Sequence, residues 1–259
     1  MTHRFEWITA LASANLRSAL ARPGQFASLA VFMGLNNLIW FALWALFFNV
    51  AGRVRGWGVH DVAEMFGIVA VAYGIHATFF GGARHLAERV LDGGLDIYLG
   101  RPRSALLGLL FSHSEPTGAG DIVSGVALIF WATSLERGLM ALGFAMLGAS
   151  VIVATYVAIN TLVFWTNGRA SVFDQLFGCF LTLASTPQMG LPIAAKILIY
   201  TALPAAFVGF VPVEILREFS AAKLAAMVAA AILAPIFAVW LFERGLKHYA
   251  SGNRMVEMA

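Results

Sequence analysis

The stretch ERVLDGGLDIYLGRP, residues 88–102, is the most polar and turn-rich part of a chain that otherwise has the composition of membrane helices. Glycine closes helix ends because it adopts the left-handed conformation without steric cost, so Gly93-Gly94 should end a short helix that begins near Arg84. Proline fits the first turn of a helix, and Pro102 therefore predicts a new helix. Between these breaks we expect a small apolar knob made of Ile97, Tyr98 and Leu99.

The same part of the chain is basic. Its arginines are Arg84, Arg89, Arg101 and Arg103. Loops rich in Lys and Arg between apolar spans stay on the cytoplasmic side of a membrane. We therefore interpret residues 84–104 as a cytoplasmic docking element. The alternative is an ordinary loop whose glycines and proline only turn the chain.

The composition indicates that the membrane is the solvent. The 259 residues are 60% hydrophobic and only 12% charged, whereas a soluble domain carries about twice that charged fraction. The net charge of +3 is too small and too scattered to indicate nucleic-acid binding. The single cysteine, Cys179, lies in an apolar run and excludes a disulfide framework, and the six histidines show no metal-ligand spacing.

Known catalytic motifs are absent from the sequence. None of the three lysines, Lys196, Lys223 and Lys247, follows a glycine, so the phosphate-binding P-loop pattern is missing. No G-x-S-x-G, H-E-x-x-H or paired-cysteine motif occurs either. We expect this chain not to hydrolyse ATP itself, and to hold no cofactor, no metal and no covalent catalytic centre.

Hydropathy predicts an all-α, polytopic membrane protein with one transmembrane domain over residues 1–259. A crossing needs about 20 apolar residues, because a helix rises ~1.5 Å per residue and the hydrocarbon core is ~30 Å thick. Residues 1–24 combine near-helical apolar spacing with interspersed charges, which predicts a helix in the membrane surface rather than a signal peptide. Six spans are expected, at 26–50, 61–83, 118–135, 139–166, 171–190 and 221–243.

The region between the fourth and the last span is irregular. Its apolar stretches are short and contain Pro192, Lys196, Pro204 and Pro212. Irregular backbone at membrane depth persists only where protein or water satisfies its polar groups. We therefore expect a crossing at 171–190 followed by a re-entrant, extracytoplasmic segment at 191–212.

Four of the polar residues within the predicted spans give specific expectations. Asn36 and Asn37 are near the middle of the first span, where hydrogen bonding between helices is the favoured interpretation and substrate contact the alternative. For His76 we favour a packing hydrogen bond, with a transport path or proton relay as the alternative. Glu64 lies near the end of its span, where water would reach it.

Other local patterns give expectations about packing. Trp57, in the turn-rich loop 52–60, is suited to the lipid headgroup level. A tight turn is expected at Glu136-Arg137-Gly138, between the third and fourth spans. Small residues recur at every fourth position of the second span and should let another helix approach closely. They are Ala70, Gly74, Thr78 and Gly82.

The distribution of Lys and Arg favours cytoplasmic N and C termini. With that orientation the cytoplasmic side carries most of the 17 basic residues, as expected for cytoplasmic loops. They are Arg4, Arg17, Arg22, Arg84, Arg89, Arg101, Arg103, Arg169, Arg244, Lys247 and Arg254. The other side carries Arg53, Arg55, Arg137, Lys196, Arg217 and Lys223, of which Arg53 and Arg55 go most clearly against the trend.

Several of these features together resemble a known family. They are the amphipathic N-terminal helix, six expected spans in 259 residues, the Gly56-Trp57 turn and the string Gly93-Gly94-Leu95-Asp96-Ile97-Tyr98-Leu99-Gly100-Arg101-Pro102. On these residues, and over nearly its whole length, the chain resembles the permease subunits of type-2 ABC exporters. It is most similar to a poorly characterised branch whose permeases are often encoded in pairs beside one ATPase.

The resemblance implies a division of labour. The permease would dimerise, with itself or with a second permease, and a separate P-loop ATPase subunit would drive export of an amphipathic or lipid-like substrate. The implied location is the bacterial inner membrane, among membrane lipids. The ATPase-coupling interface would consist of Glu88, Arg89, Gly94, Leu95, Asp96, Arg101 and Pro102. Candidates for the translocation path are Asn36, Asn37 and His76.

Two other functions stay open at this point. A proton-coupled secondary transporter would use His76, Glu64 or Lys196 as a relay and would work without nucleotide. A membrane scaffold or assembly factor would transport nothing under either energy source.

Overall fold

The computed structural model describes residues 6–101, 104–166, 168–188 and 191–249, and apart from one bridge between Val54 and Trp57 their regular structure is helical. The predicted all-α class is therefore confirmed. In chain order the elements are α1 (Glu6–Leu20), α2 (Pro23–Ala51), α3 (Val59–Phe80), η2 (Gly81–His85), α4 (Leu86–Leu91), α5 (Asp96–Leu99), α6 (Ala105–Leu110), α7 (Thr117–Ala132), α8 (Leu135–Thr161), α9 (Val163–Thr166), α10 (Ala170–Ala184), α11 (Ile193–Tyr200), η3 (Ala205–Phe207), α12 (Phe210–Arg217) and α13 (Ala221–Leu246).

Among the described residues, four helical stretches are long and apolar enough to cross a membrane, as a polytopic membrane protein requires. They are Pro23–Ala51, Val59–Leu91, Leu135–Thr166 and Ala221–Leu246. The apolar helices α7 and α10 have only 16 and 15 residues, which corresponds to roughly 24 Å of rise. The count of six crossings therefore stays a prediction.

Some expected boundaries are wrong. Residues 136–138 do not form a turn, because α8 already begins at Leu135 and the Ser134 hydroxyl oxygen accepts a hydrogen bond from the Arg137 backbone N–H at 3.5 Å. A serine at this position caps a helix by binding one of its unpaired N–H groups. The preceding helix ends at Ala132, and α10 ends at Ala184, short of the expected 190.

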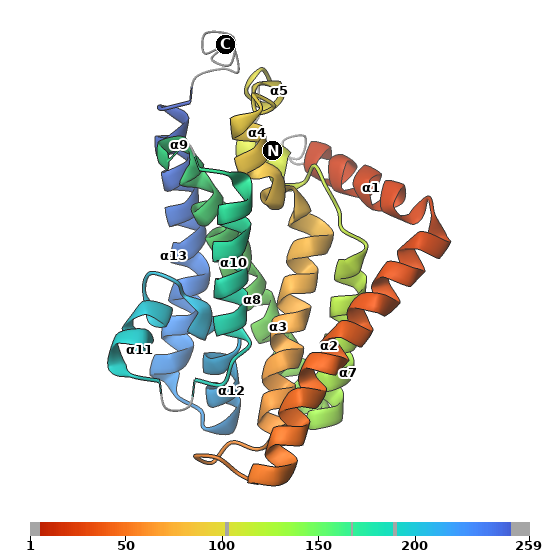
Figure 1. Cartoon of the computed structure of the whole chain (residues 1–259), viewed down its shortest axis with the longest axis vertical. Coiled ribbons are helices and arrows are strands. Elements are labelled where there is room, and N and C mark those ends of the chain that lie inside the picture. The colour runs from red at the N-terminus through yellow and green to blue at the C-terminus, as the bar shows by residue number, and fades with distance from the viewer. Residues whose placement is uncertain (1–5, 102–103, 167, 189–190, 250–259) are drawn as a thin grey trace.

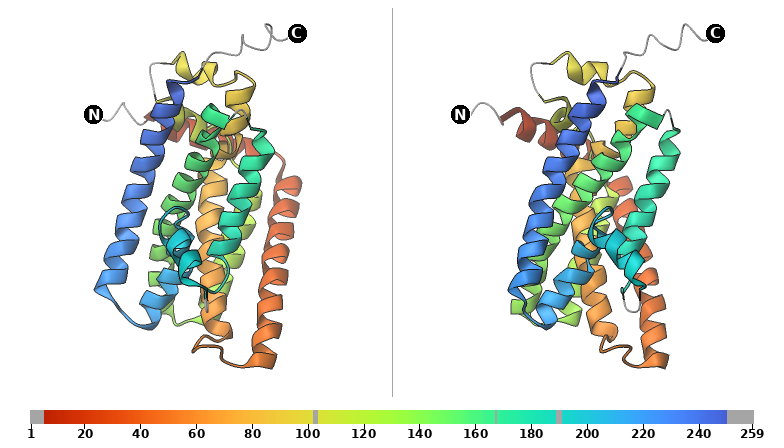
Figure 2. Two further views of the ribbon diagram at one scale, coloured as in Figure 1. Left: turned by 60° about the vertical axis from the view of Figure 1, so that its left-hand side comes forward. Right: turned by 90° about the vertical axis from the view of Figure 1, so that its left-hand side faces the viewer.

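The helices form one bundle around α3 and α8. α3 packs against α7 and α8, α13 packs against α8, and α2 packs against α7 (Figure 1). α1 crosses one end of the bundle, where α4, α5 and the end of α13 also lie (Figures 1 and 2). We call this the α5 end. The loop 52–58 and α12 mark the opposite end.

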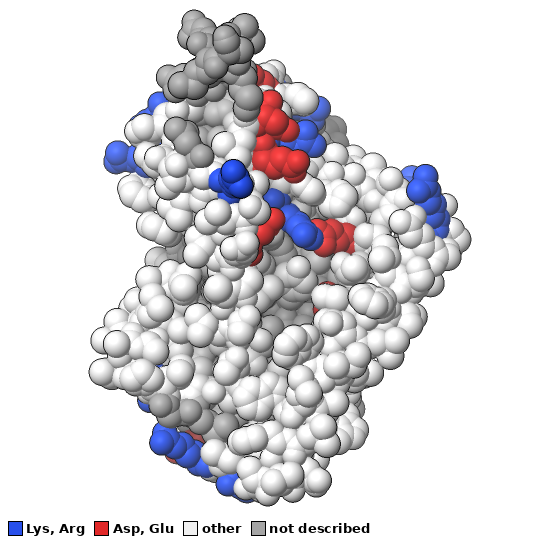
Figure 3. All heavy atoms as spheres, in the orientation of Figure 1, with Lys and Arg blue, Asp and Glu red and all other residues white. Residues whose placement is uncertain are grey.

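Charged side chains gather toward the two ends of the bundle. On the face drawn in Figure 3, a broad uncharged region separates the charges near the α5 end from the Lys and Arg residues at the opposite end. A few charged groups extend into a hollow below the α5 end. An uncharged belt is what a hydrocarbon core requires, because a charge at membrane depth is costly unless it is paired or wet.

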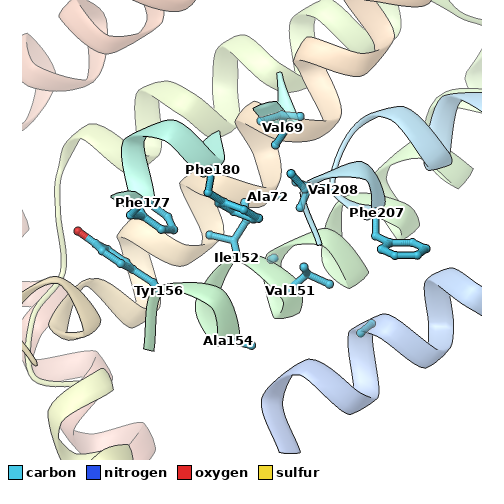
Figure 4. Packing of buried hydrophobic residues seen from close by; sticks show 14 of the residues in the cluster. Val69, Ala72, Val151, Ile152, Ala154, Tyr156, Phe177, Phe180, Phe207 and Val208 are labelled. Atoms are coloured by element: carbon cyan, nitrogen blue, oxygen red, sulfur yellow. The ribbon is translucent and has the colours of Figure 1, made fainter. Parts of the chain in front are cut away.

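Part of the hydrophobic core lies where α3, α8 and α10 meet (Figure 4). Tyr156 of α8 stacks on Phe177 of α10, with ring centroids 3.7 Å apart and 15° between the ring planes. Phe180 and Ile152 are fully buried nearby. Aromatic side chains bury a large area each. This contact therefore fixes α10 against the bundle.

Glycines bring α3 and α7 unusually close together. A Cβ atom on Gly74 would lie 2.7 Å from the carbonyl oxygen of Gly118, and one on Gly125 would lie 2.7 Å from the carbonyl oxygen of Gly67. Real Cβ atoms do not approach an oxygen that closely, so larger residues would push the helices apart. Close backbone approach through small residues is a common way for membrane helices to associate.

The expected small-residue ridge of α3 is only partly correct. Gly74 and Thr78 do face α7. Ala70 instead lines a groove described below, and Gly82 packs against the carbonyl group of Leu109 in α6. The ridge therefore serves two neighbouring helices instead of one.

The short helices α11 and α12 lie in the half of the bundle away from the α5 end (Figure 2). Trp57 stacks on Phe210 at the start of α12, with ring centroids 5.1 Å apart. Arg217, at the end of α12, lies over the Trp57 ring and donates a hydrogen bond to the Gly56 carbonyl oxygen at 2.9 Å. Trp57 is buried, so its expected place among lipid headgroups is wrong. It ties the loop 52–58 to α12.

Candidate functional site

The segment after α4 is shaped by a tight turn. The backbone of Gly93 has a φ of 76°, which favours glycine, and the Asp92 side chain accepts a hydrogen bond from the Gly94 N–H at 2.8 Å. A Cβ atom on Gly94 would lie 2.8 Å from that carboxylate and 2.9 Å from the Cδ atom of Arg89. The helix therefore ends where the two glycines predicted. Gly94 shapes the turn, and Arg89 packs against it.

Beyond the turn, α5 presents apolar side chains to the surroundings. Ile97 is 60% exposed and Leu99 is 42% exposed, while Tyr98 lies against Gly108 of α6. The expected apolar knob therefore exists, although Tyr98 points partly inward. We call Ile97 and Leu99 the α5 knob. They stand at the bundle end that carries the most mixed charge, away from the apolar belt (Figures 1 and 3).

The predicted coupling residues occupy different environments. Glu88, Asp96 and Arg101 are exposed, and Arg89 and Gly94 are half-buried. Leu95 is fully buried in the core, so a direct contact between Leu95 and a docked partner is excluded in this conformation. Pro102 lies outside the described residues.

The two asparagines of α2 lie at a groove between α2, α3, α7 and the end of α10. The Asn37 amide donates hydrogen bonds to Asp121 Oδ1 at 2.7 Å and to Ser124 Oγ at 2.9 Å, both on α7. Interhelical hydrogen bonding by Asn37 is therefore confirmed. Asn36 and Asn37 also line the groove, which has a volume of about 460 Å³.

Aromatic, aliphatic and hydroxyl side chains form the rest of the groove. It opens in the hollow seen in Figure 3, below the charged groups near the α5 end. Asp121 is the acidic residue in its wall. The remaining lining comes from Met33, Trp40, Trp44, Phe66, Val69, Ala70, Tyr73, Leu128, Leu181, Thr182, Ser185 and Thr186.

His76 lies in the core and does not line the groove. Its ring is buried among Tyr73, Tyr156 and Phe177, with the Tyr156 centroid 5.1 Å away, and within the described part of the chain its Nδ1 atom has no hydrogen-bond partner. The packing hydrogen bond that the sequence predicted for His76 is therefore not made by Nδ1. The Tyr156 hydroxyl turns to Asp174 instead, donating to Oδ1 at 2.9 Å.

Glu64 is not accessible to water, contrary to expectation. Its carboxylate is fully buried and accepts hydrogen bonds from Arg137 Nε at 2.8 Å and Nη2 at 2.5 Å. A buried carboxylate held by a guanidinium is occupied by its partner and is poorly suited to carry protons. This geometry disfavours Glu64 as the relay of a secondary transporter. No group of three potential metal ligands occurs within the described ranges.

The family follows from comparison with known proteins. A family model described as ABC-2 family transporter protein matches residues 35–252, which include most of α2 and every later helix. The chain belongs to the ABC-2 transporter family. The expected type-2 ABC permease is therefore confirmed, and the ABC-2 match makes the chain the membrane-embedded permease of an ABC system. No curated protein and no solved structure matches it significantly.

The sequence interpretation of this ABC-2 permease missed two functional candidates. One is Asp121, which lies inside the span expected at 118–135 and carried a usable signal, because an acidic residue within a span marks a functional site by default. The other is the exposure of Ile97 and Leu99. Their positions were noted, but which member of an apolar cluster faces outward depends on neighbouring helices.

Proposed function

We propose that this ABC-2 permease is the membrane-spanning subunit of an ATP-driven export system, powered by a separate P-loop ATPase that docks on the α5 knob. A second permease, identical or related, would complete the translocation path. The α5 end would face the cytoplasm of a bacterial inner membrane. ATP hydrolysis would then take place entirely in the partner chain.

The exposed α5 knob is the observation that carries this proposal. Ile97 and Leu99 are exposed at a polar end of the bundle, where lipid tails do not cover apolar side chains. The same segment also exposes the charged residues Glu88, Asp96 and Arg101, and a combination of exposed apolar and charged residues is typical of protein interfaces, whose centre is apolar and whose rim is polar.

The surroundings of α2 support the second permease. Its inward face packs against α7 and α3, while Phe32, Ile39 and Leu46 on the outer face are all more than half exposed. A second permease seated on this side would enclose the groove next to α2. Lipid would cover the same face in an isolated chain, so the contact requires a direct test.

Co-purification tests the docking role of the α5 knob. The tagged full chain is extracted from its native membranes in mild detergent, and the bound proteins are examined for a P-loop sequence and for ATPase activity. Ile97→Asp should reduce capture of that chain about ten-fold or more, because a charge would be buried in a desolvated interface. Leu135→Asp is the matched control, since Leu135 is 70% exposed, against 60% for Ile97, but lies at the start of α8, away from the knob.

Two results would contradict the proposal. If the wild-type protein co-purifies with no P-loop chain, the proposal of a separate ATPase is wrong. Equal capture by Ile97→Asp and wild type would move the docking surface away from α5. Leu95→Asp is unsuitable for this test, because Leu95 is buried and its replacement would disrupt the fold itself.

A further inference from the structure

The carboxylate of Asp121 is only half satisfied. The side chain is 2% exposed, its Oδ1 atom accepts the hydrogen bond from Asn37, and its Oδ2 atom has no hydrogen-bond partner among the residues that the structure describes. A buried carboxylate oxygen without a partner is costly in a low-dielectric surrounding. Because Asp121 stands in the groove wall, a ligand in the groove is well placed to supply the missing positive charge.

The neighbouring charges leave the groove negative. Arg84 pairs with Glu115 at 3.4 Å, and in the described part of the chain Asp174 accepts a hydrogen bond only from the neutral hydroxyl of Tyr156. Of the three carboxylates Glu115, Asp121 and Asp174, only Glu115 has an arginine partner among the described residues. None of the described lining residues is Lys or Arg.

The groove walls suit a cation attached to an apolar body. Trp40, Trp44 and Tyr73 line it, and aromatic faces attract cations as well as covering apolar chains. Thr182 and Trp40 are exposed at its rim. A long ligand can therefore enter sideways from the membrane without passing through the core.

We propose that this groove binds a cationic amphiphile, with an ammonium group on Asp121 and an alkyl or aromatic tail against Trp40 and Trp44. The ammonium donates to Oδ2 and neutralises the buried charge. Calling this ligand the exported substrate rests on the proposed function, whereas binding itself requires neither the ATPase nor a second permease.

Quenching of tryptophan fluorescence tests the proposal directly. The full chain is placed in phosphatidylcholine nanodiscs and titrated with a bromine-labelled dodecylamine, because bromine quenches nearby tryptophans and two of them line the groove. Bromine-labelled dodecanol and dodecyl sulfate have the same tail but carry a neutral and a negative head. We expect saturable quenching by the amine, and only weak, non-saturating quenching by the other two.

The Asp121→Asn variant removes the charge and keeps the shape. It should weaken amine binding about ten-fold or more, since a charge-assisted hydrogen bond becomes a neutral one. Glu136→Gln is the matched control. It also removes one negative charge, but at an exposed position at the start of α8, beyond the end of α7 that is far from Asp121. It should leave binding unchanged.

A second variant distinguishes weaker ligand binding from misfolding of Asp121→Asn. Thr182→Phe narrows the groove at an exposed rim position, where packing is little disturbed, and should also reduce quenching. Equal affinity for the amine and the alcohol, or unchanged binding in both Asp121→Asn and Thr182→Phe, would overturn the proposal. ATPase capture by Asp121→Asn should match wild type, so a failure here is distinguishable from a failure of docking.

The same nanodiscs identify the source of the ammonium group. Phosphatidylethanolamine carries a primary ammonium in its headgroup, whereas phosphatidylcholine does not. Replacing half of the phosphatidylcholine should leave amine binding unchanged if the ligand is a single-chain amphiphile. Competition by phosphatidylethanolamine that disappears in Asp121→Asn would assign the groove to a lipid headgroup, with the same chemistry at Asp121.

Discussion

Arg137 holds the buried carboxylate of Glu64 through two hydrogen bonds, from Nε at 2.8 Å and from Nη2 at 2.5 Å. The pair joins the first turn of α8 to the second turn of α3, at the end opposite α5. Two bonds between planar groups fix both side chains in orientation as well as distance. This contact therefore sets how α8 meets α3.

Breaking this pair should destabilise the protein. Arg137→Met leaves the Glu64 carboxylate buried without a partner, which costs about 3 kcal/mol, at the low end for buried pairs because Arg137 is partly exposed. Thermal unfolding in detergent should show a lower midpoint, and Glu64→Gln in the same chain should recover part of the loss. Glu136→Gln, one residue away, should behave like wild type. An unchanged midpoint for Arg137→Met would mean that the pair does not support the fold.

The crossing of α3 and α7 should not tolerate a methyl group. Gly74→Ala would place a Cβ atom 2.7 Å from the Gly118 carbonyl oxygen, and the forced separation should cost about 1–3 kcal/mol. Gly143→Ala is the matched control on α8, because nothing lies within 4 Å of its Cβ position. It should be neutral or stabilising by up to about 1 kcal/mol. Similar unfolding midpoints for the two variants would argue against close packing at Gly74.

Stability should fall as the pH drops toward 5. Partial desolvation of the exposed His113 side chain, with the nearby charges of His85 and Arg84, lowers its pKa in the loop before α7, although Glu115 acts in the opposite direction. The unfolded chain then binds a proton more readily than the folded chain, so stability is fully present above the ordinary pKa of about 6.5 and is lost below it. The unfolding midpoint should fall between pH 7 and pH 5, and His113→Gln should reduce that fall. An identical pH profile for the variant would exclude His113 as the cause.

The orientation in the membrane can be tested with single cysteines. In a Cys179→Ala background, Arg53→Cys marks the loop 52–58 and Lys247→Cys marks the α5 end, both at exposed positions. A membrane-impermeant maleimide should label Arg53→Cys on intact cells and Lys247→Cys only after permeabilisation. The reverse pattern would place the α5 end outside and remove the cytoplasmic docking role.

The long helices could be predicted from the sequence because the hydropathy of a stretch, which decides whether it lies in lipid or in water, is a local property. Apolar runs placed α2, α3, α8 and α13, and the glycines of the 88–102 stretch marked the end of α4. The helix start at Leu135 was missed because Ser134, a good cap, precedes a Glu-Arg-Gly sequence that suggests a turn. Here the hydrogen bond from the Arg137 N–H to the Ser134 side chain favours a helix start over a turn.

The candidate site was harder to predict, since burial depends on neighbours that are distant in sequence. Leu95 and Ile97 are two residues apart in one apolar cluster, yet one is fully buried and the other mostly exposed. Glu64 is buried and bound by Arg137, which lies 73 residues later in the chain. Asp121 could have been selected by its charge alone, but its pairing with Asn37 needed the structure.

The helical stretch from Val59 to Leu91 has 33 residues and includes the 3-10 segment η2, at whose borders Phe80 and His85 leave α-helical backbone angles. At ~1.5 Å per residue its helical path amounts to roughly 50 Å. One tip ends just before the knob, and the other is anchored near Glu64. A force applied at Ile97 would therefore be transmitted along this stretch toward the Arg137–Glu64 pair, which holds its far end. It would also shift the close contact between α3 and α7 at their glycines.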